Sequence, residues 1–320
     1  MTVVTTAAAT GGTGRRASPP VRARSRRRVA WWAGGFLFPA VLLFAGLVVL
    51  PIVLAVLLSF TSWSGSGPII PVGAANWVRF AGDSDAHAAL VRTAVLVVAC
   101  WAIQTPVAVA IGIYAAGQQR HRAVLSTVWF LPALVSSAAL GVLWSQLLSP
   151  VNGGVRYAAE HFGFFFLDRD WLGDPNLAMG TVIVLVCWQF IPFHALLFQA
   201  GVRQIPRSLY EAAAIDGFSG WQRTRYITLP MLRHTIVTSS TLNIVGSLTV
   251  FDLIFTLTGG GPGQSTRVLA LAQYLEGFRG LDFGYASVLA VVLGGAAVVI
   301  SLVLVRVTGF GAMRSEAEGV

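Results

Sequence analysis

The chain has 320 residues, of which 55% are hydrophobic and only 11% charged, with a formal net charge of +9. An ordinary soluble domain carries roughly 25% charged residues, so this composition excludes a soluble globule and indicates a polytopic membrane protein. All 22 basic residues are arginine; because a Walker A loop needs a lysine, the chain cannot carry that nucleotide site itself.

The first predicted element is a basic tail. Residues 1–29 are rich in Ala, Thr, Gly, Pro and Arg and lack apolar periodicity, which predicts a disordered cytoplasmic segment. Its seven arginines precede an apolar run and are typical of topology signals rather than of nucleic-acid binding. The run from Ala30 to Phe60 is too long for a signal-peptide core and has no obvious cleavage site, so we expect an uncleaved first span.

Six apolar stretches follow one another along the chain. A bilayer core about 30 Å thick needs roughly 20 apolar residues per helix, and each stretch is long enough to cross with some tilt. Prolines inside them are tolerated where neighbouring helices satisfy the freed carbonyls. We therefore predict an all-α membrane protein. It has a domain at 30–308, a second cytoplasmic tail at 309–320, and six transmembrane helices at approximately 34–60, 92–116, 123–147, 177–201, 234–258 and 284–306.

The arginines also predict the orientation of the spans. With the N-terminus inside, the two tails and the loops 117–122 and 202–233 hold sixteen arginines, whereas the outside loops and span entrances hold six. Such an excess is the positive-inside bias. It places both termini and the segment 203–232 in the cytoplasm.

The segment 203–232 has the signals of a short amphipathic helix. Ser208 and Glu211 have the spacing of a capping box, and Gly217 is a natural residue to end the helix. A second short turn is expected at about 219–226. An ordinary linker resting on the membrane surface would have the same signals, so these signals alone do not decide the role of the segment.

The spacing of fixed positions in this segment resembles a known signature. Glu211-Ala212-Ala213 is followed after three residues by Gly217, and after nine more by Ile227-Thr228-Leu229-Pro230. This pattern resembles the cytoplasmic coupling helix of the permease subunits of bacterial binding-protein-dependent ATP-driven importers. The similarity runs diffusely from about Phe36 to Arg306 and is again specific at 249–262. It is similar above all to maltose-type and glycerol-3-phosphate-type permeases.

This resemblance implies a type I ABC importer permease fold and a set of partners. The chain would form half of the translocation pathway in the bacterial plasma (inner) membrane, in contact with lipid but not with nucleic acid. It would work with a second permease, related but not identical, two ATPase subunits and an extracytoplasmic solute-binding protein. ATP and Mg would be bound by the ATPase, with no cofactor and no catalytic residue on this chain. The residues expected to couple to the ATPase are Tyr210, Glu211, Ala212, Ala213, Ala214, Ile215, Asp216 and Gly217.

Tyr210 is expected to have a specific role in the contact with the ATPase. Together with Ala213 and Ala214 it lies on one side of the predicted helix. Small alanines would let the helix backbone sit deep in a groove of the ATPase, with Tyr210 as an aromatic anchor, as in other helix-in-groove complexes.

Polar residues within the spans mark a candidate solute pathway. A sugar needs hydroxyl partners beside an aromatic face, and such residue types follow one stripe of the fifth span and part of the fourth. Helix–helix packing enriches small and polar residues equally, so both roles stay open. The residues assigned to the pathway are Trp188, Gln189, Phe190, Phe193, Asn243, Gly246, Ser247 and Val250. Because no span carries an arginine at its middle, a neutral di- or oligosaccharide is favoured over a phosphorylated solute.

A further set of residues is expected to be structural. Asp252 is the single carboxylate within a predicted span, and we expect it to hydrogen-bond to a neighbouring helix or to the glycine turn. No strand precedes that glycine run, so it is interpreted as a turn and not as a phosphate cradle. His194 is expected to be packed and hydrogen-bonded. Cys100 and Cys187 have no disulfide or metal spacing and should be small packing residues. The structural set is Asp252, Pro230, Gly260 and Pro262.

Two other classes of protein have less support. An ion- or proton-coupled secondary transporter would need a coupling site, for which the sequence offers Asp252 and His194, and inverted repeats are not evident. A membrane enzyme would need a catalytic motif, such as His-Glu-x-x-His or Gly-x-Ser-x-Gly, and the sequence contains neither.

Overall fold

The computed structural model describes residues 37–117 and 120–307. The chain divides into two compact units, the first ending at Val53 and the second beginning at Leu54. The tails predicted at 1–29 and 309–320 lie outside the described residues. The first predicted span is present as a helix from Leu37 to Leu58, which contains a π-helical turn η1 (Ala45–Val49) and continues as α2 (Leu50–Leu58).

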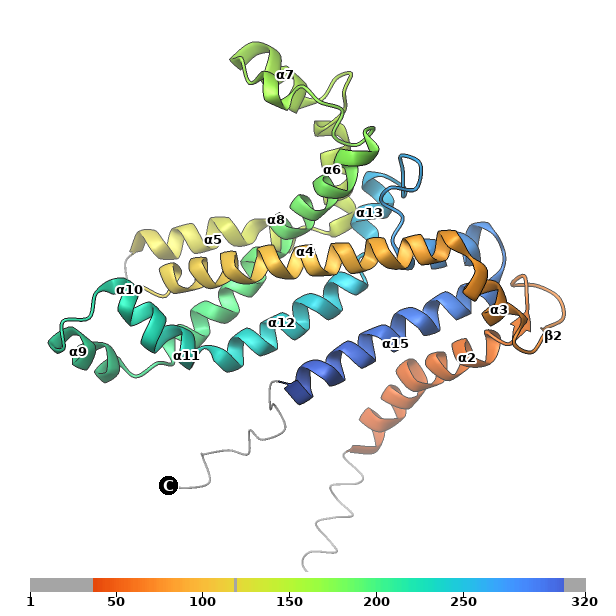
Figure 1. Cartoon of the computed structure of the whole chain (residues 1–320), viewed down its shortest axis with the longest axis horizontal. Coiled ribbons are helices and arrows are strands. Elements are labelled where there is room, and N and C mark those ends of the chain that lie inside the picture. The colour runs from red at the N-terminus through yellow and green to blue at the C-terminus, as the bar shows by residue number, and fades with distance from the viewer. Residues whose placement is uncertain (1–36, 118–119, 308–320) are drawn as a thin grey trace, which may run out of the picture. The chain divides into compact units, whose positions relative to one another are not determined.

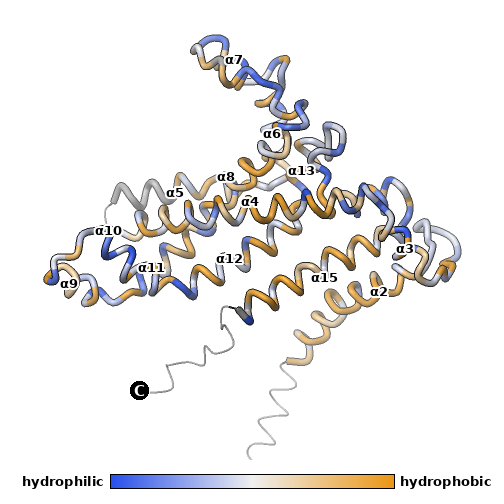
Figure 2. The backbone as a smooth tube through the Cα atoms, in the orientation of Figure 1, coloured by the Kyte–Doolittle hydropathy of each residue, from blue (hydrophilic) through white to orange (hydrophobic). Residues whose placement is uncertain are grey.

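Two long helices form the centre of the second unit (Figure 1). They are α4 (Ser84–Ala115) and α8 (Pro175–Arg203), and they make the most extensive contact between any two elements. The predicted fourth span is confirmed within two residues at each end. The second begins earlier than predicted, because the Asp83 side chain caps α4 by accepting from two backbone N–H groups. Figure 2 shows hydrophobic residues along both helices.

Close backbone approach holds α4 and α8 together. In lipid the hydrophobic effect does not drive helices together, so association depends on van der Waals packing and interhelical hydrogen bonds. Gly112 lies directly against α8, and the Gln199 side chain donates a 2.8 Å bond to the Ala115 carbonyl. Phe198 is fully buried in this contact.

The predicted third span is wrong as a single helix. It consists of α5 (Arg120–Leu134) and α6 (Ser137–Leu147), which meet at a bend of 98°. Pro132 removes one donor from the ladder near the end of α5. The break is then stabilised from another helix, because Gln189 of α8 donates to the Val135 carbonyl at 3.2 Å and to Ser137 at 3.0 Å.

The predicted fifth span is also divided. It consists of α12 (Arg233–Leu248) and α13 (Asp252–Leu257). α13 packs against α6, where a Cβ at Gly141 would fall 1.9 Å from the Thr256 hydroxyl oxygen. By length and composition the described residues contain four helices able to cross a membrane, or five if the bent pair α5–α6 is one span. Neither α12 nor α13 alone is long and apolar enough to cross a membrane, so the fifth of the six predicted spans is not matched by a single helix.

The remaining elements connect these helices. A two-stranded antiparallel pair precedes α3, with Thr61 opposite Pro71. The sixth predicted span is confirmed as α15. Hydrophilic residues gather in α7 and around α10 in Figure 2. The bounds are β1 (Thr61–Ser62), β2 (Ile70–Pro71), α3 (Ala75–Gly82), α7 (Gly154–Phe162), η2 (Phe165–Leu167), α14 (Leu269–Tyr274), η4 (Leu275–Arg279) and α15 (Phe283–Val307).

Charged side chains fasten the start of α15 to α3 and α4. Arg79 pairs with Asp282 at 2.6 Å and with Glu276 at 3.6 Å, and its guanidinium lies 3.8 Å from the centre of the Tyr285 ring. The Tyr285 hydroxyl donates to the Asp83 carboxylate. Two regions that lie about 200 residues apart in the sequence are thereby joined.

The Asp83–Tyr285 bond predicts a pH dependence. Burial alone would raise the pKa of Asp83, but the bond from Tyr285 and two backbone donors outweigh burial and lower that pKa. The stabilisation is therefore complete above the unfolded pKa of about 3.9 and is lost as the pH falls through the lower native pKa. We expect Tyr285→Phe to lower the unfolding temperature of purified protein by a few degrees at pH 7, from a bond of about 1 kcal/mol.

That difference should shrink as the pH of the thermal unfolding experiment falls below 4, because wild type progressively loses the same contribution there. Tyr157→Phe, which alters an exposed ring on α7, serves as the control. Melting curves of wild type and Tyr285→Phe that stay equally far apart from pH 7 to pH 3 would contradict this linkage.

Candidate functional site

The predicted coupling segment is a chain of short helices. They are α9 (Arg207–Ile215), α10 (Gly220–Arg223), a π-helical turn η3 (Thr224–Thr228) and α11 (Leu229–Met231). Gly217 ends α9 as predicted, with φ of +76°. The Phe218 N–H bonds the Ala213 carbonyl and the Gly217 N–H bonds the Ala214 carbonyl, which is the Schellman pattern.

The predicted capping box at the start of this helix is wrong. α9 begins two residues earlier than the box requires, at Arg207, after Pro206, and no side chain caps it. Glu211 pairs instead with Arg207 at 3.1 Å, one helical turn away. A capping box is present at the start of α10, where Ser219 and Gln222 bond each other's backbone N–H groups.

The two faces of α9 differ from the prediction in one respect. Ala213 is 5% exposed and Tyr210 is half-buried, with its hydroxyl 2.9 Å from Thr228. These two residues face the rest of the segment and not outward, so Tyr210 as an outward anchor is wrong. Ile215, in contrast, is 87% exposed. The outward surface, which we call the coupling surface, consists of Leu209, Glu211, Ala212, Ala214, Ile215, Asp216, Trp221 and Tyr226.

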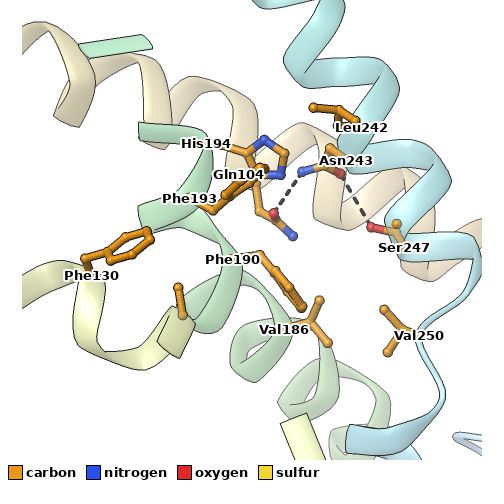
Figure 3. A pocket seen from close by; sticks show the side chains of 12 residues that line it. Gln104, Phe130, Val186, Phe190, Phe193, His194, Leu242, Asn243, Ser247 and Val250 are labelled. Atoms are coloured by element: carbon orange, nitrogen blue, oxygen red, sulfur yellow. Dashed lines mark hydrogen bonds between the residues drawn. The ribbon is translucent and has the colours of Figure 1, made fainter. Parts of the chain in front are cut away.

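A cavity of about 310 Å³ lies among α4, α5, α8 and α12 (Figure 3). Six of the eight residues assigned to the solute pathway line it: Phe190, Phe193, Asn243, Gly246, Ser247 and Val250. The aromatic rings come mainly from α8, and the polar side chains come from α12 (Asn243 and Ser247), α4 (Gln104) and α8 (His194). An apolar face beside hydrogen-bonding side chains is the combination that a sugar ring requires.

Polar side chains of this cavity are linked to one another. Asn243 donates a 2.8 Å bond to Gln104 of α4, and Ser247 lies 3.5 Å from the Asn243 amide oxygen. His194 lies 2.9 Å from the Ser239 hydroxyl, so it is packed and hydrogen-bonded as predicted. None of the twelve lining residues is Arg, Lys, Asp or Glu.

Two residues assigned to the pathway lie elsewhere. Gln189 is buried and holds the α5–α6 break, and Trp188 packs edge-on against Trp144 at 5.5 Å. Both face α5 and α6 and not the cavity. Sequence reasoning missed the remaining lining residues; of these, Gln104 could have been found, as a polar residue within a predicted span. The lining residues that were not assigned to the pathway are Gln104, Phe130, Ala133, Val186, His194 and Leu242.

The predicted structural residues have mixed outcomes. Asp252 begins α13 and is exposed, and among the described residues its carboxylate has no hydrogen-bond partner, so the expected structural bond is wrong. Gly260 is buried with φ of +96°, and a Cβ there would contact Leu271 at 3.0 Å. The glycine run is therefore a turn, with Pro262 inside it. Pro230 lies in α11, where a missing N–H is tolerated.

Comparison with known proteins places the chain in a family. Residues 108–310 match the inner membrane component of binding-protein-dependent transport systems, and the chain belongs to that family. A probable ABC transporter permease protein of Pyrococcus horikoshii is 32% identical over 83% of this chain and 92% of its own length. The lactose transport system permease protein of Rhizobium radiobacter is 29% identical over 84% and 92%.

A solved structure has the same fold. It is a bacterial ABC transporter involved in importing the acidic polysaccharide alginate, with a TM-score of 0.77 at 21% identity, covering 91% of this chain and 99% of that chain. The chain is thus a non-catalytic permease subunit of an ABC transporter, a multi-pass membrane protein, and ATP hydrolysis belongs to a partner chain. The alternatives of a secondary transporter and a membrane enzyme are excluded by this membership.

Proposed function

We propose that the chain is one of two related permease subunits of an importer for a neutral di- or oligosaccharide, in the plasma membrane of a bacterium. The observation that carries the choice of solute is the cavity among α4, α5, α8 and α12. Its phenylalanines offer flat apolar faces, its amide and hydroxyl groups offer hydrogen bonds, and its lining carries no Arg, Lys, Asp or Glu. The lactose permease named above supports a sugar as solute, since it is similar over most of both chains.

The coupling surface is proposed to bind the ATPase. Ile215 and Trp221 are large apolar side chains that are 87% and 74% exposed, although they lie in a segment that arginine counting places in the cytoplasm. A patch of this kind is typical of a protein–protein contact. The assembled transporter would also contain an extracytoplasmic solute-binding protein and a second permease. Closure of an ATPase pair would move α9 and change the side of the membrane from which the cavity is accessible. ATP and Mg would be bound by the ATPase, with no cofactor on this chain.

Affinity purification of the chain from its native membrane in mild detergent tests this assembly. Mass spectrometry should find an ATPase and a second permease with wild type. Glu211→Arg should reduce the ATPase at least about tenfold, because it reverses a charge within the coupling surface and so disturbs its electrostatic complementarity to the partner, where a loss of about 1.4 kcal/mol is already tenfold. Glu160→Arg is a matched control. Its glutamate pairs with Arg156 of α7 in the same i,i+4 geometry, at 2.8 Å against 3.1 Å, but α7 is expected outside. A wild-type chain that purifies without any ATPase would contradict the proposal.

A further inference from the structure

A hydrogen bond joins the beginning and the end of the coupling segment. The Tyr210 hydroxyl lies 2.9 Å from the Thr228 hydroxyl, 18 residues later. Thr228 is 3% exposed and its hydroxyl also reaches the Arg223 carbonyl at 3.4 Å. A threonine hydroxyl has one proton, and the Arg223 carbonyl can only accept. The Tyr210 hydroxyl is therefore the donor to Thr228.

Local contacts stabilise the chain between Tyr210 and Thr228. The Schellman pattern at Gly217 closes α9, the capping box of Ser219 and Gln222 opens α10, and the rings of Phe218 and Tyr226 meet edge to face at 6.3 Å. The two backbone patterns each fix one turn. The ring contact reaches Tyr226 of η3, but it starts from Phe218, beyond the Gly217 bend, so it does not hold α9 itself against η3. The contact between Tyr210 and Thr228 closes the loop and makes α9, α10 and η3 one body.

That body continues directly into the wall of the cavity. η3 runs through Leu229 into α11, and Leu232, which is 1% exposed, packs in one cluster with Ala195 and Phe198 of α8. α12 begins at the next residue and carries Asn243 to the cavity. A displacement of η3 is therefore expected to move the N-terminal end of α12 at Arg233.

We propose that Tyr210 is a positioning residue for energy coupling, whose hydrogen bond to Thr228 transmits the movement of α9 to α12. The inference rests on the proposed function, in which an ATPase binds the coupling surface. Tyr210 does not belong to that surface, so it acts through Thr228 and not by touching the ATPase. Without this bond α9 can turn about the Gly217 bend while η3 stays in place.

The test measures cavity access in the purified complex with ATP as the only ligand, so no sugar needs to be identified. Leu242→Cys places a reporter thiol on the cavity, where the native side chain is 48% exposed, whereas Cys100 and Cys187 are 0% and 4% exposed. Trapping ATP with vanadate should change the rate at which a water-soluble maleimide alkylates this thiol. With Tyr210→Phe we expect that change to be about fivefold smaller, a factor that corresponds to about 1 kcal/mol for one neutral hydrogen bond. The amount of trapped nucleotide should remain that of the parent complex.

Companion variants separate transmission from general damage. Thr228→Ser keeps the hydroxyl and should respond as wild type, and Thr228→Val should equal Tyr210→Phe. The double variant should be no worse than either single one, because both remove the same bond. Thr224→Val removes a hydroxyl of the same segment that bonds only the Gly220 carbonyl within its own turn, and it should leave the response unchanged.

Three outcomes would overturn the inference. If Tyr210→Phe traps nucleotide and shows the full change in alkylation, the inference fails and the proposed function stands. If Tyr210→Phe loses the ATPase, Tyr210 shapes the docking surface and does not transmit movement. If the wild-type complex contains no ATPase, the proposed function fails and the inference fails with it.

Discussion

Gly112→Val is expected to eliminate properly folded protein. A Cβ at this position would lie 2.5 Å from the Phe198 Cβ and 2.8 Å from the Ala195 carbonyl oxygen. Such contacts cannot be relieved by rotating a side chain, because each involves the backbone or the first side-chain atom of α8. The two central helices would have to separate, which also breaks the bond from Gln199 to the Ala115 carbonyl. Overpacking of a tight core costs about 1–3 kcal/mol or more, and we place this case at the upper end.

Size-exclusion chromatography of detergent-extracted, fluorescently tagged protein measures the effect as the loss of the monodisperse peak. Gly180→Val is the matched control, since Gly180 lies in α8 but a Cβ there meets no atom within 4 Å. If Gly112→Val gives a monodisperse peak as large as that of Gly180→Val, the α4–α8 contact is looser than described.

Asn243→Leu is expected to reduce transport at least about tenfold while the complex still assembles. Leucine has a similar size but cannot donate to Gln104, so the buried Gln104 oxygen loses its 2.8 Å partner. Leaving such a group unpaired costs about 1–3 kcal/mol. The change also removes from the cavity an amide that we assign to the sugar hydroxyls. Uptake of labelled sugar into cells that express the complete transporter measures the loss.

Thr241→Val tests whether the effect belongs to the cavity. Its hydroxyl lies on the same helix but bonds the Val237 carbonyl one turn away and does not line the cavity. We expect uptake within about twofold of wild type, since only a bond within one helical turn is lost. Uptake at the wild-type rate by Asn243→Leu would remove this cavity from the solute pathway.

The sequence predicts those parts of the fold that local chemistry decides. α8 and α15 are long apolar runs that end where charged or polar residues begin, and their observed bounds differ from the prediction by two residues or fewer. Gly217 ends α9 because its φ of +76° costs glycine little. The stripe of polar residues on the fifth span reaches the cavity because helical periodicity places Asn243 and Ser247 on one face.

The sequence does not predict features that depend on contacts between distant segments. Pro132 is compatible with a kinked span as well as with a broken one. The 98° bend between α5 and α6 is held by Gln189, more than 50 residues away. The same contact explains why Gln189 is absent from the cavity. Ser208 does not cap α9, because the helix already starts at Arg207. Arg207 also pairs with Glu211, and this pair uses the glutamate side chain that a capping box would need.

Uptake by the purified complex in proteoliposomes tests the central claim most directly. The complex, its solute-binding protein and labelled lactose, other neutral disaccharides or a sugar phosphate would be combined with and without ATP inside the vesicles, and with or without a proton gradient. We predict uptake of a neutral sugar that requires ATP and the binding protein and is indifferent to the gradient. Uptake that needs only the proton gradient, or that prefers the sugar phosphate, would contradict the account.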